Sequence, residues 1–217
     1  QLVSIKYQMN WPSPGTDPAY NAQGAARRVF YGVSGIPDVI YSGSNEPTSQ
    51  AIIDSLQSLP ALVNLTADWS DSSSIVQCNV TAEILDDVDS NLVLHIALIE
   101  SEISHNTQTN GETTFYHVFR KFMDGSSGYS MGTLTAGNTY TYSTSTTIST
   151  NSNPSQGSYD FWAGTNNLEV IVWLQNPVTK EVVQAAYADE VLPCAGPVVS
   201  PVVTTDTAAF LSWEGLD

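Results

Sequence analysis

Three side chains in a short acidic run have the types and the spacing to hold a cation. Asp87, Asp89 and Asn91 alternate with single residues, and Asp86 precedes them. Hard cations such as calcium take carboxylate and amide oxygens as ligands. The run lacks the glycine and the later glutamate of an EF-hand loop, and Asp and Asn are also favoured in tight turns. The sequence therefore offers Asp87, Asp89 and Asn91 as calcium candidates, with a hairpin turn as the competing interpretation, and it indicates no other cofactor.

The two cysteines, Cys78 and Cys194, form neither a C-x-x-C pair nor a metal framework. Cys78 falls on the inward side of an alternating segment, where a free thiol behaves as a small apolar side chain. A disulfide between Cys78 and Cys194 is the alternative, and it would suit a protein outside the cytosol.

The remaining chemistry-bearing residues make no catalytic pattern. His95, His105 and His117 have no H-x-H or H-x-x-x-H spacing, so only the fold could gather them into a metal site. Glu100 and Glu102 have no evident partner for acid/base work. The sequence contains no G-x-S-x-G elbow, phosphate loop or H-E-x-x-H motif. We therefore predict no catalytic residue.

Aromatic side chains concentrate between residues 129 and 162. Rings exposed on a sandwich loop can stack on sugars or on a protein partner, and Tyr159 and Trp162 are the candidates for such contacts. Packing within and between strands is the other interpretation, and we favour it. The concentration comprises Tyr129, Tyr140, Tyr142, Tyr159, Phe161 and Trp162.

The charge balance excludes several classes of partner. The 217 residues include 22 acids and 6 bases, for a net charge of −16, and no base occurs between Val29 and Phe119. Nucleic acid requires a basic track, and anionic membrane surfaces require basic clusters. No apolar run approaches the roughly 18 residues of a transmembrane helix. Since charged residues are only 13% and Ser and Thr crowd the second half, we expect an exported protein.

Residues 1–60 have the order of an α/β unit. A strand is expected at 2–7, a helix at 21–30 capped by Asn21, a strand at 38–41 and a helix at 48–59.

From residue 61 to 192 the apolar period is two. Val76, Cys78, Val80, Ala82 and Ile84 alternate with polar residues, as in a half-buried strand. Seven short strands separated by turns predict an antiparallel, seven-strand, Ig-like β-sandwich. We expect them at 61–68, 76–84, 92–101, 114–122, 139–149, 168–176 and 181–189.

Residues 193–217 read as a linker followed by the start of a fibronectin type III-like or adhesin-type module. Two strands do not make a stable sandwich. We therefore expect this tail to continue in a longer parent protein, to pack on the sandwich, or to pair with the sheet edge of a neighbour.

A family resemblance rests on two segments. The run from Arg27 to Ile40, with Val33-Ser34-Gly35-Ile36-Pro37 inside it, resembles the C-terminal half of a thioredoxin-like domain. That resemblance implies a cis peptide bond between Ile36 and Pro37. Together with the sandwich and the hairpin of residues 169–186, it resembles the outer-membrane-protein-28-related family of Bacteroidetes. Such proteins join a thioredoxin-like domain to an all-β domain.

One departure from that family bears on function. The first strand, the first helix and the C-x-x-C of a thioredoxin-like domain are missing from this sequence, so dithiol chemistry has no redox pair here.

We therefore expect an α+β multidomain chain with a partial thioredoxin-like unit, a β-sandwich and the start of a third module. Its expected function is that of a non-catalytic interaction or assembly region of a secreted or cell-surface bacterial protein. The resemblance implies a location that is extracellular or on the outer-membrane surface. The partners would be proteins, or further copies joined through β-strand edges. The alternatives are a thiol-disulfide oxidoreductase with its C-x-x-C upstream of residue 1, and a carbohydrate-binding module.

Overall fold

The computed structural model describes residues 2–11, 15, 17–45, 49–104, 111–192, 200–204 and 209–212; for Asp89, Ser90 and the last two ranges it describes the backbone alone. Two helices and eleven strands occur within these residues. They are α1 (Ala22–Tyr31), α2 (Gln50–Gln57), β1 (Val63–Ser72), β2 (Ile75–Ile84), β3 (Val88–Ile103), β4 (Phe115–Phe122), β5 (Tyr129–Leu134), β6 (Thr139–Thr147), β7 (Leu168–Gln175), β8 (Val182–Tyr187), β9 (Asp189–Glu190), β10 (Ser200–Thr204) and β11 (Ala209–Ser212).

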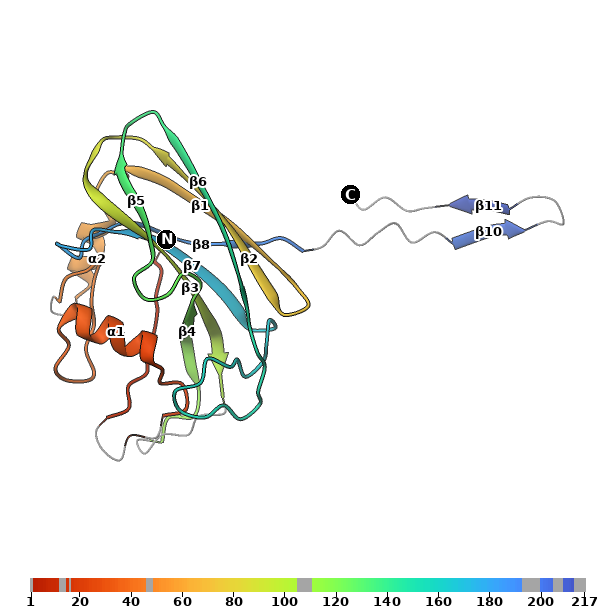
Figure 1. Ribbon diagram of the computed structural model, residues 1–217, viewed down its shortest axis with the longest axis horizontal. Coiled ribbons are helices and arrows are strands. Elements are labelled where there is room, and N and C mark those ends of the chain that lie inside the picture. The colour runs from red at the N-terminus through yellow and green to blue at the C-terminus, as the bar shows by residue number, and fades with distance from the viewer. Residues whose placement is uncertain are drawn as a thin grey trace.

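Strands β1 to β9 form two packed sheets (Figure 1). The first sheet has the order β6-β2-β1-β9, and the second has the order β4-β3-β7-β8. The 16-residue β3 pairs with β7 along one side, while β5 and β4 pair with successive parts of its other side. The chain changes sheets directly after β8, because β9 pairs with β1 and not with β7.

The space between the sheets is filled by the alternating residues that the sequence indicated. Val76, Cys78, Val80, Ala82 and Ile84 all point inward from β2 and are at most 3% exposed. They pack against residues of β1, β3 and β7 in one continuous apolar cluster.

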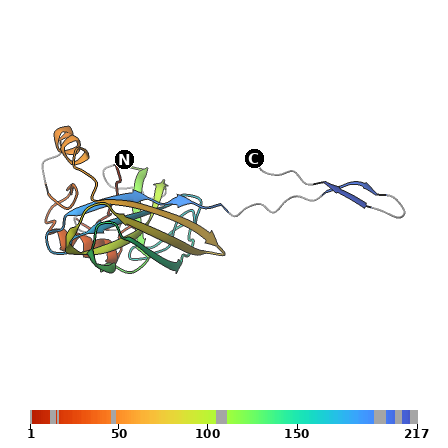
Figure 2. The same ribbon diagram turned by 90° about the horizontal axis from the view of Figure 1, so that it is seen from above.

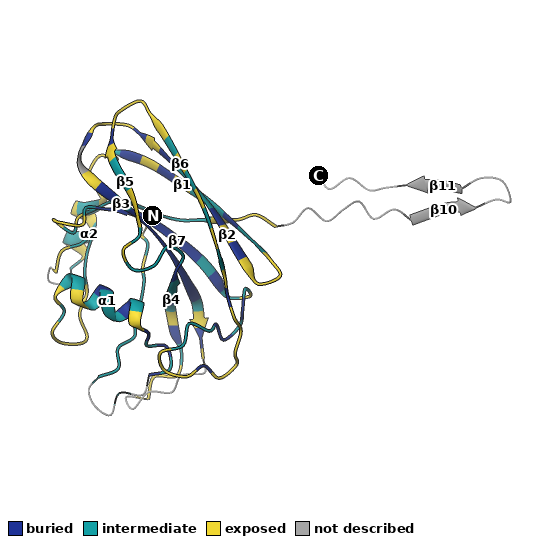
Figure 3. Ribbon diagram, in the orientation of Figure 1, coloured by how far each residue is buried: buried dark blue, intermediate teal, exposed yellow. Residues whose placement is uncertain are grey.

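Strands β3 and β7 are buried on both faces, which a simple sandwich does not require. A second cluster, with Ile99, Phe119, Phe122, Ile171 and Trp173 among its members, lies on the outer face of the β4-β3-β7-β8 sheet. Side chains of the N-terminal residues 3–7 pack against that cluster, and α1 packs against β4. The burial colours of Figure 3 show the result, since β3 and β7 are dark along most of their length.

The expected α/β unit in residues 1–60 was wrong. The segment expected as a strand at 2–7 makes one bridge, from Lys6 to Val118, and the segment at 38–41 makes one bridge, from Tyr41 to Ser44. These segments do not pair with each other in a sheet. The physical reason is that Val3, Ile5 and Tyr7 bury their apolar surface against the outer face of the sandwich. The described residues form a β-rich fold with two short helices, and not a thioredoxin-like unit followed by a sandwich.

The helices begin within two residues of the expected starts, at Ala22 and Gln50. The Asn21 side chain caps α1 by accepting a hydrogen bond from the Gly24 N–H at 3.0 Å, and Ser49 caps α2 through Ile52. None of the residues of α2 is buried, and Figure 2 shows this helix standing off one end of the sheets. Between the helices, the Ile36–Pro37 peptide bond is cis.

Three strand assignments differ from the sequence prediction. β5 and β9 were not expected, and β3 begins at Val88, inside the acidic run expected as a turn. β5 contains Gly132 at φ 70° and pairs irregularly with β3, which explains why no alternating pattern marked it.

The C-terminal strands β10 and β11 form an antiparallel ribbon with a register shift between Pro201 and Val203. Two strands are too few to identify a module, so the fibronectin type III-like start remains a prediction.

Candidate functional site

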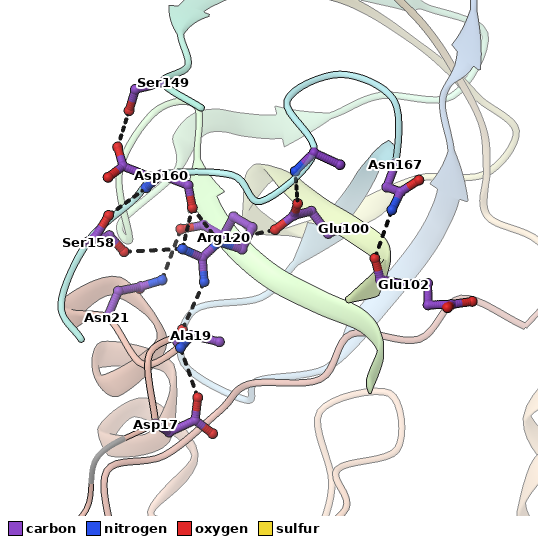
Figure 4. Close-up of polar contacts among 11 residues, drawn as sticks. Asp17, Ala19, Asn21, Glu100, Glu102, Arg120, Ser149, Ser158, Asp160 and Asn167 are labelled. Atoms are coloured by element: carbon purple, nitrogen blue, oxygen red, sulfur yellow. Dashed lines mark hydrogen bonds and ion pairs between the residues drawn. The ribbon is translucent and has the colours of Figure 1, made fainter. Parts of the chain in front are cut away.

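A buried arginine organises the end of the sandwich nearest the N-terminal segment. The Arg120 side chain comes from β4 and is fully buried. Its guanidinium donates to the carbonyl oxygens of Ala19 (3.3 Å), Ser158 (3.5 Å) and Asp160 (Figure 4). It also lies 4.7 Å from the centre of the Trp162 ring. These contacts join β4 to two loops far apart in the sequence.

Glu100, on β3, provides the counter-charge. Its Oε2 lies 3.6 Å from Arg120 Nε, and its Oε1 accepts from the Ala163 N–H at 3.1 Å. Burial raises the pKa of the Glu100 carboxyl, while the Ala163 N–H and the Arg120 charge act against that rise. Because both side chains are wholly enclosed, the pair can hold loops together but cannot reach a substrate.

A second buried polar group lies between α1 and the same sheet. Arg27 Nη2 donates to Tyr31 Oη at 2.6 Å and to Gln175 Oε1 at 2.5 Å. Gln175 Nε2 in turn donates to Tyr31 Oη and to the Lys180 carbonyl. The Arg27 guanidinium also lies 5.6 Å from the centre of the Trp173 ring. This network fixes α1 on the outer face of the sheet.

His95 borders that network. It is 4% exposed, and its ring stacks on Trp173 with 5.0 Å between centroids. Its Nδ1 has no hydrogen-bond partner among the described residues. Burial, reinforced by the charge of Arg27, lowers the pKa of His95 to about 3. The imidazole is therefore neutral at ordinary pH and serves as a packed ring.

A solvent-accessible cleft of about 450 Å³ lies where the chain crosses from one sheet to the other. The crossing runs from Tyr187, at the end of β8, to Glu190 in β9. Hydrogen bonds from Ala188 N–H to Val170 and from Val191 N–H to Trp69 fix it at both ends. The lining residues are Trp69, His117, Leu168, Glu169, Tyr187, Ala188 and Glu190.

Three polar side chains from three strands meet in this cleft. His117 Nδ1 lies 3.0 Å from Tyr187 Oη and 3.8 Å from Glu169 Oε2. His117 has φ 53°, an unusual backbone conformation for a residue other than glycine. Its carbonyl accepts from the Lys6 N–H at 2.8 Å, so the N-terminal segment helps to hold this turn of the backbone. The cleft is thus a preformed polar site on rigid strands.

Strand β6 forms an edge of the other sheet. Its register with β2 is continuous over nine pairs. At the two ends of this register, the Ile84 N–H donates to the Asn138 carbonyl and the Ile148 N–H donates to the Ser74 carbonyl. Because bonded and non-bonded pairs alternate in an antiparallel ladder, the even-numbered residues of β6 bond to β2. The odd-numbered residues, from Thr139 to Thr147, direct their N–H and C=O groups away from β2, and their side chains are exposed.

Three other sheet edges, those of β4, β8 and β1, are covered at some positions. Lys6 bonds to both His117 and Phe119 along β4, Ser42 makes two hydrogen bonds to Val182 of β8, and β9 pairs with β1. Along β6, a single contact to an outward carbonyl is found in the described part of the chain, from Lys121 Nζ to Thr147 O at 3.1 Å. β6 is therefore a long, regular and largely open edge.

The calcium candidates are not assembled into a site by the residues that the structure describes. Asp87 Oδ1 accepts from the Ala136 N–H at 2.8 Å, and Asn91 is an exposed residue of β3. The side chain of Asp89 lies outside the described part. Among the described residues, no group of three or more His, Cys, Asp or Glu side chains is placed to hold a metal ion. Calcium binding here remains a prediction.

The structure describes one of the two cysteines. Cys78 is fully buried between the sheets, where burial raises the pKa of its thiol to about 12, so it is a structural thiol in the described structure. Cys194 lies outside the described residues, as does His105. The Cys78–Cys194 disulfide therefore stays untested.

The two candidate aromatic residues differ in exposure. Trp162 is 7% exposed and its ring faces Arg120, whereas Tyr159 is half-buried. The Trp162 ring therefore packs in the protein and does not offer a surface for stacking on sugars in this structure.

The cleft residues were missed because nothing in the sequence links them. His117, Glu169 and Tyr187 lie on strands β4, β7 and β8, and no motif has their spacing. Their one available signal was alternation along the β7–β8 hairpin, which places Glu169 and Tyr187 on the same face as Ile171 once the register is known.

Compared with models of known protein families and with curated proteins, the chain gives no match. Among solved structures, it is similar to a domain of the outer membrane lipoprotein Omp28 from Porphyromonas gingivalis. The identity is 16%, the TM-score is 0.42, and the match covers 60% of this chain and 90% of that one. This likeness does not show that the chain belongs to the same family. Among the described residues, no helix is long and apolar enough to cross a membrane.

Proposed function

We propose that this chain is a non-catalytic assembly domain of an exported or cell-surface bacterial protein, and that it joins a second copy through β6. The observation that carries the proposal is the character of this edge. The strand consists of nine residues, all Ser, Thr or Tyr, and its five odd-numbered residues present a row of outward backbone donors and acceptors without a charge, a proline or a bulge. Natural proteins ordinarily protect such an edge with one of those devices.

The choice of a second copy as the partner rests on charge. Two chains that each carry −16 repel one another over most of their surfaces. An antiparallel β6–β6 pair centred on Ser143 would place Thr139 opposite Thr147 and Thr141 opposite Ser145. No carboxylate belongs to that pair of strands, and Thr–Thr and Thr–Ser neighbours across strands are favourable. β6 is therefore a place where two copies can approach closely.

A proline at position 143 tests the proposal. The Ser143 N–H points away from β2, so Ser143→Pro removes an outward donor and keeps the β2–β6 ladder intact. We expect the wild-type chain to form dimers in a concentration series by sedimentation velocity, and S143P to remain monomeric with an unchanged circular dichroism spectrum. Higher salt should strengthen the dimer, because it screens the repulsion between the two acidic copies.

A matched pair of lysine variants separates an edge effect from a charge effect. Ser145 on the edge strand lies opposite Gln77 on the interior strand β2, and both are exposed. S145K should weaken dimerisation at least tenfold, whereas Q77K should leave it within twofold. A wild-type chain that stays monomeric at high concentration and high salt, or an S143P variant that dimerises normally, would refute the proposal. If deletion of residues 193–217 abolished the dimer, the adding strand would be the tail and not β6.

The two alternative functions have less support. The oxidoreductase hypothesis required a thioredoxin-like unit in residues 1–60, and the described residues of that segment do not build one. The sugar-binding hypothesis relied on Trp162 together with Tyr159, and Trp162 is buried under Arg120.

A further inference from the structure

The centre of β6 is tied to the opposite sheet by one carboxylate. Asp124 lies in the connection between β4 and β5, which belong to the other sheet. Its Oδ1 accepts hydrogen bonds from the Tyr142 hydroxyl at 2.9 Å and from the Thr144 hydroxyl at 3.0 Å. These two β6 residues flank Ser143, and their side chains lie on the half-buried face of the strand. A single acceptor therefore holds β6 on both sides of its central residue.

The Tyr142 ring makes a second contact with the opposite sheet. It stacks on Tyr129, the first residue of β5, with 3.9 Å between ring centroids and 24° between ring planes. Stacked rings attract each other beyond the effect of the area that they bury. The hydroxyl and the ring of Tyr142 are thus held separately, by the β4–β5 connection and by β5.

Hydrogen bonds on the other face of the sheet hold the same part of β6. Ser143 Oγ donates to Asn79 Oδ1 at 2.9 Å, and Asn79 Nδ2 donates to Asp68 Oδ1 at 2.8 Å. This row runs from β6 through β2 to β1. Among the described residues, no other side chain of β6 makes a hydrogen bond. The polar side-chain contacts of this edge are therefore concentrated at residues 142–144.

Such restraint matters at an edge, where a single ladder holds the strand. β6 pairs with β2 and with no other strand of the described residues, and elements with few contacts open more easily than the core. Pairing with a second copy has to order any part of β6 that bends or frays, and this loss of entropy opposes binding. A centre that is held in advance lowers that cost.

We propose that Asp124 is a positioning residue for the β6 edge, which holds residues 142–144 in the extended form that pairs with a second copy in the register centred on Ser143. This role depends on the β6 pairing proposed above. A pair centred on Thr141 or on Ser145 would join fewer outward residues of the two strands, and the held segment would lie away from its centre.

Two substitutions of Asp124 separate its acceptor from its charge. Asp124→Ala removes both, whereas Asp124→Asn keeps Oδ1 as an acceptor and replaces Oδ2, which has no hydrogen-bond partner among the described residues. In sedimentation velocity, with every variant folded, we expect the D124A dimer to be about fivefold weaker than wild type, the effect of roughly one hydrogen bond. D124N should restore most of that affinity. Asp54→Ala, which removes an exposed carboxylate from α2, controls for net charge and should leave the affinity unchanged.

Disulfide trapping measures the register itself. In a chain with Cys194→Ser, Cys78 stays buried and the pKa of its thiol is raised to about 12, so only an introduced cysteine reacts. Ser143→Cys should form a disulfide with its own copy, because opposite residues of an antiparallel pair lie close enough for one. Thr141→Cys should instead need a partner that carries Ser145→Cys.

The ratio of these yields distinguishes positioning from general stability. D124A should lower the S143C yield relative to that of T141C alone, whereas a loss of stability by itself would lower both yields and leave their ratio unchanged. Tyr142→Phe combined with Thr144→Val removes both donors to Asp124 and keeps the aromatic stack. This double variant should reproduce the D124A result.

Failure of this role and failure of the β6 pairing give different results. If the wild type dimerises and D124A matches it in affinity and in the ratio of disulfide yields, the positioning role is overturned and the pairing stands. If the wild type stays monomeric at high concentration and high salt, the pairing is refuted, and the positioning role with it.

Discussion

Replacing His95 should remove an acid-sensitive component of stability. The ring is 4% exposed and lies between Trp173 and Phe122. Its pKa falls from 6.5 to about 3 in the folded chain, first because of burial and second because of the Arg27 charge. Below pH 6.5 the unfolded chain binds a proton that the folded chain does not bind, so stability falls as the pH is lowered through this window.

The size of the effect follows from the two pKa values. Each pKa unit corresponds to about 1.4 kcal/mol. The contribution of His95 to the free energy of unfolding should therefore fall by about 2 kcal/mol between pH 7.5 and pH 5, and by about 5 kcal/mol once the pH is below 3. The first interval is the better one to measure, because most carboxylates stay ionised above pH 5.

Urea unfolding of the wild type and His95→Phe at pH 7.5, 6.0 and 5.0 measures this contribution. Phenylalanine keeps a ring between Trp173 and Phe122 and removes the titrating group. We expect the wild type to lose about 2 kcal/mol more than H95F over this interval. Phe122→Leu is the control, since it alters the same packing without removing the imidazole and should retain the wild-type pH dependence. An H95F variant with the wild-type pH dependence would show that His95 is not held neutral by burial.

Two further predictions concern the loops around the sheet. Glu100→Gln should lower the free energy of unfolding at pH 7 by about 3 kcal/mol in urea titrations, because it leaves the buried Arg120 without its counter-charge. Replacing both Glu100 and Arg120 should cost less than the sum of the single replacements, and strict additivity would argue against coupling. Gly43→Ala should lower the melting temperature by several degrees more than Gly32→Ala. Both glycines have positive φ, but an added Cβ at Gly43 would lie 1.8 Å from the Lys180 carbonyl oxygen, whereas the one at Gly32 would meet open space; equal effects would contradict this.

Much of the sandwich was predictable because the alternation of apolar and polar residues along a strand indicates directly which side chains are buried. Val76 to Ile84 alternate in the sequence and in the structure, and Asn21 and Ser49 cap their helices as their residue types indicate. The α/β interpretation of residues 1–60 failed for a different reason. The apolar residues Val3, Ile5 and Tyr7 indicate that a segment is buried, but not which surface buries it, and here that surface is the sandwich.

The sites were less predictable than the fold. The Arg120–Glu100 pair joins residues that do not share a motif, and the cleft joins His117 to Tyr187 across 70 positions. Whether residues on different strands meet depends on the order of the strands in the sheet, and the local sequence pattern does not determine that order. The open edge of β6 had a clearer signal in its uncharged Ser/Thr run, yet only the sheet order shows that the run lies at an edge.

The placement of the bases has a consequence for resistance to proteolysis. A trypsin-like protease needs an extended, accessible segment around Lys or Arg. In this chain none of the six such residues is fully exposed, and Arg27 and Arg120 are buried. Cleavage at these positions would require local opening of the fold. Because the few Lys and Arg residues all make contacts within the fold, we expect trypsin-like proteases to cleave the folded chain slowly.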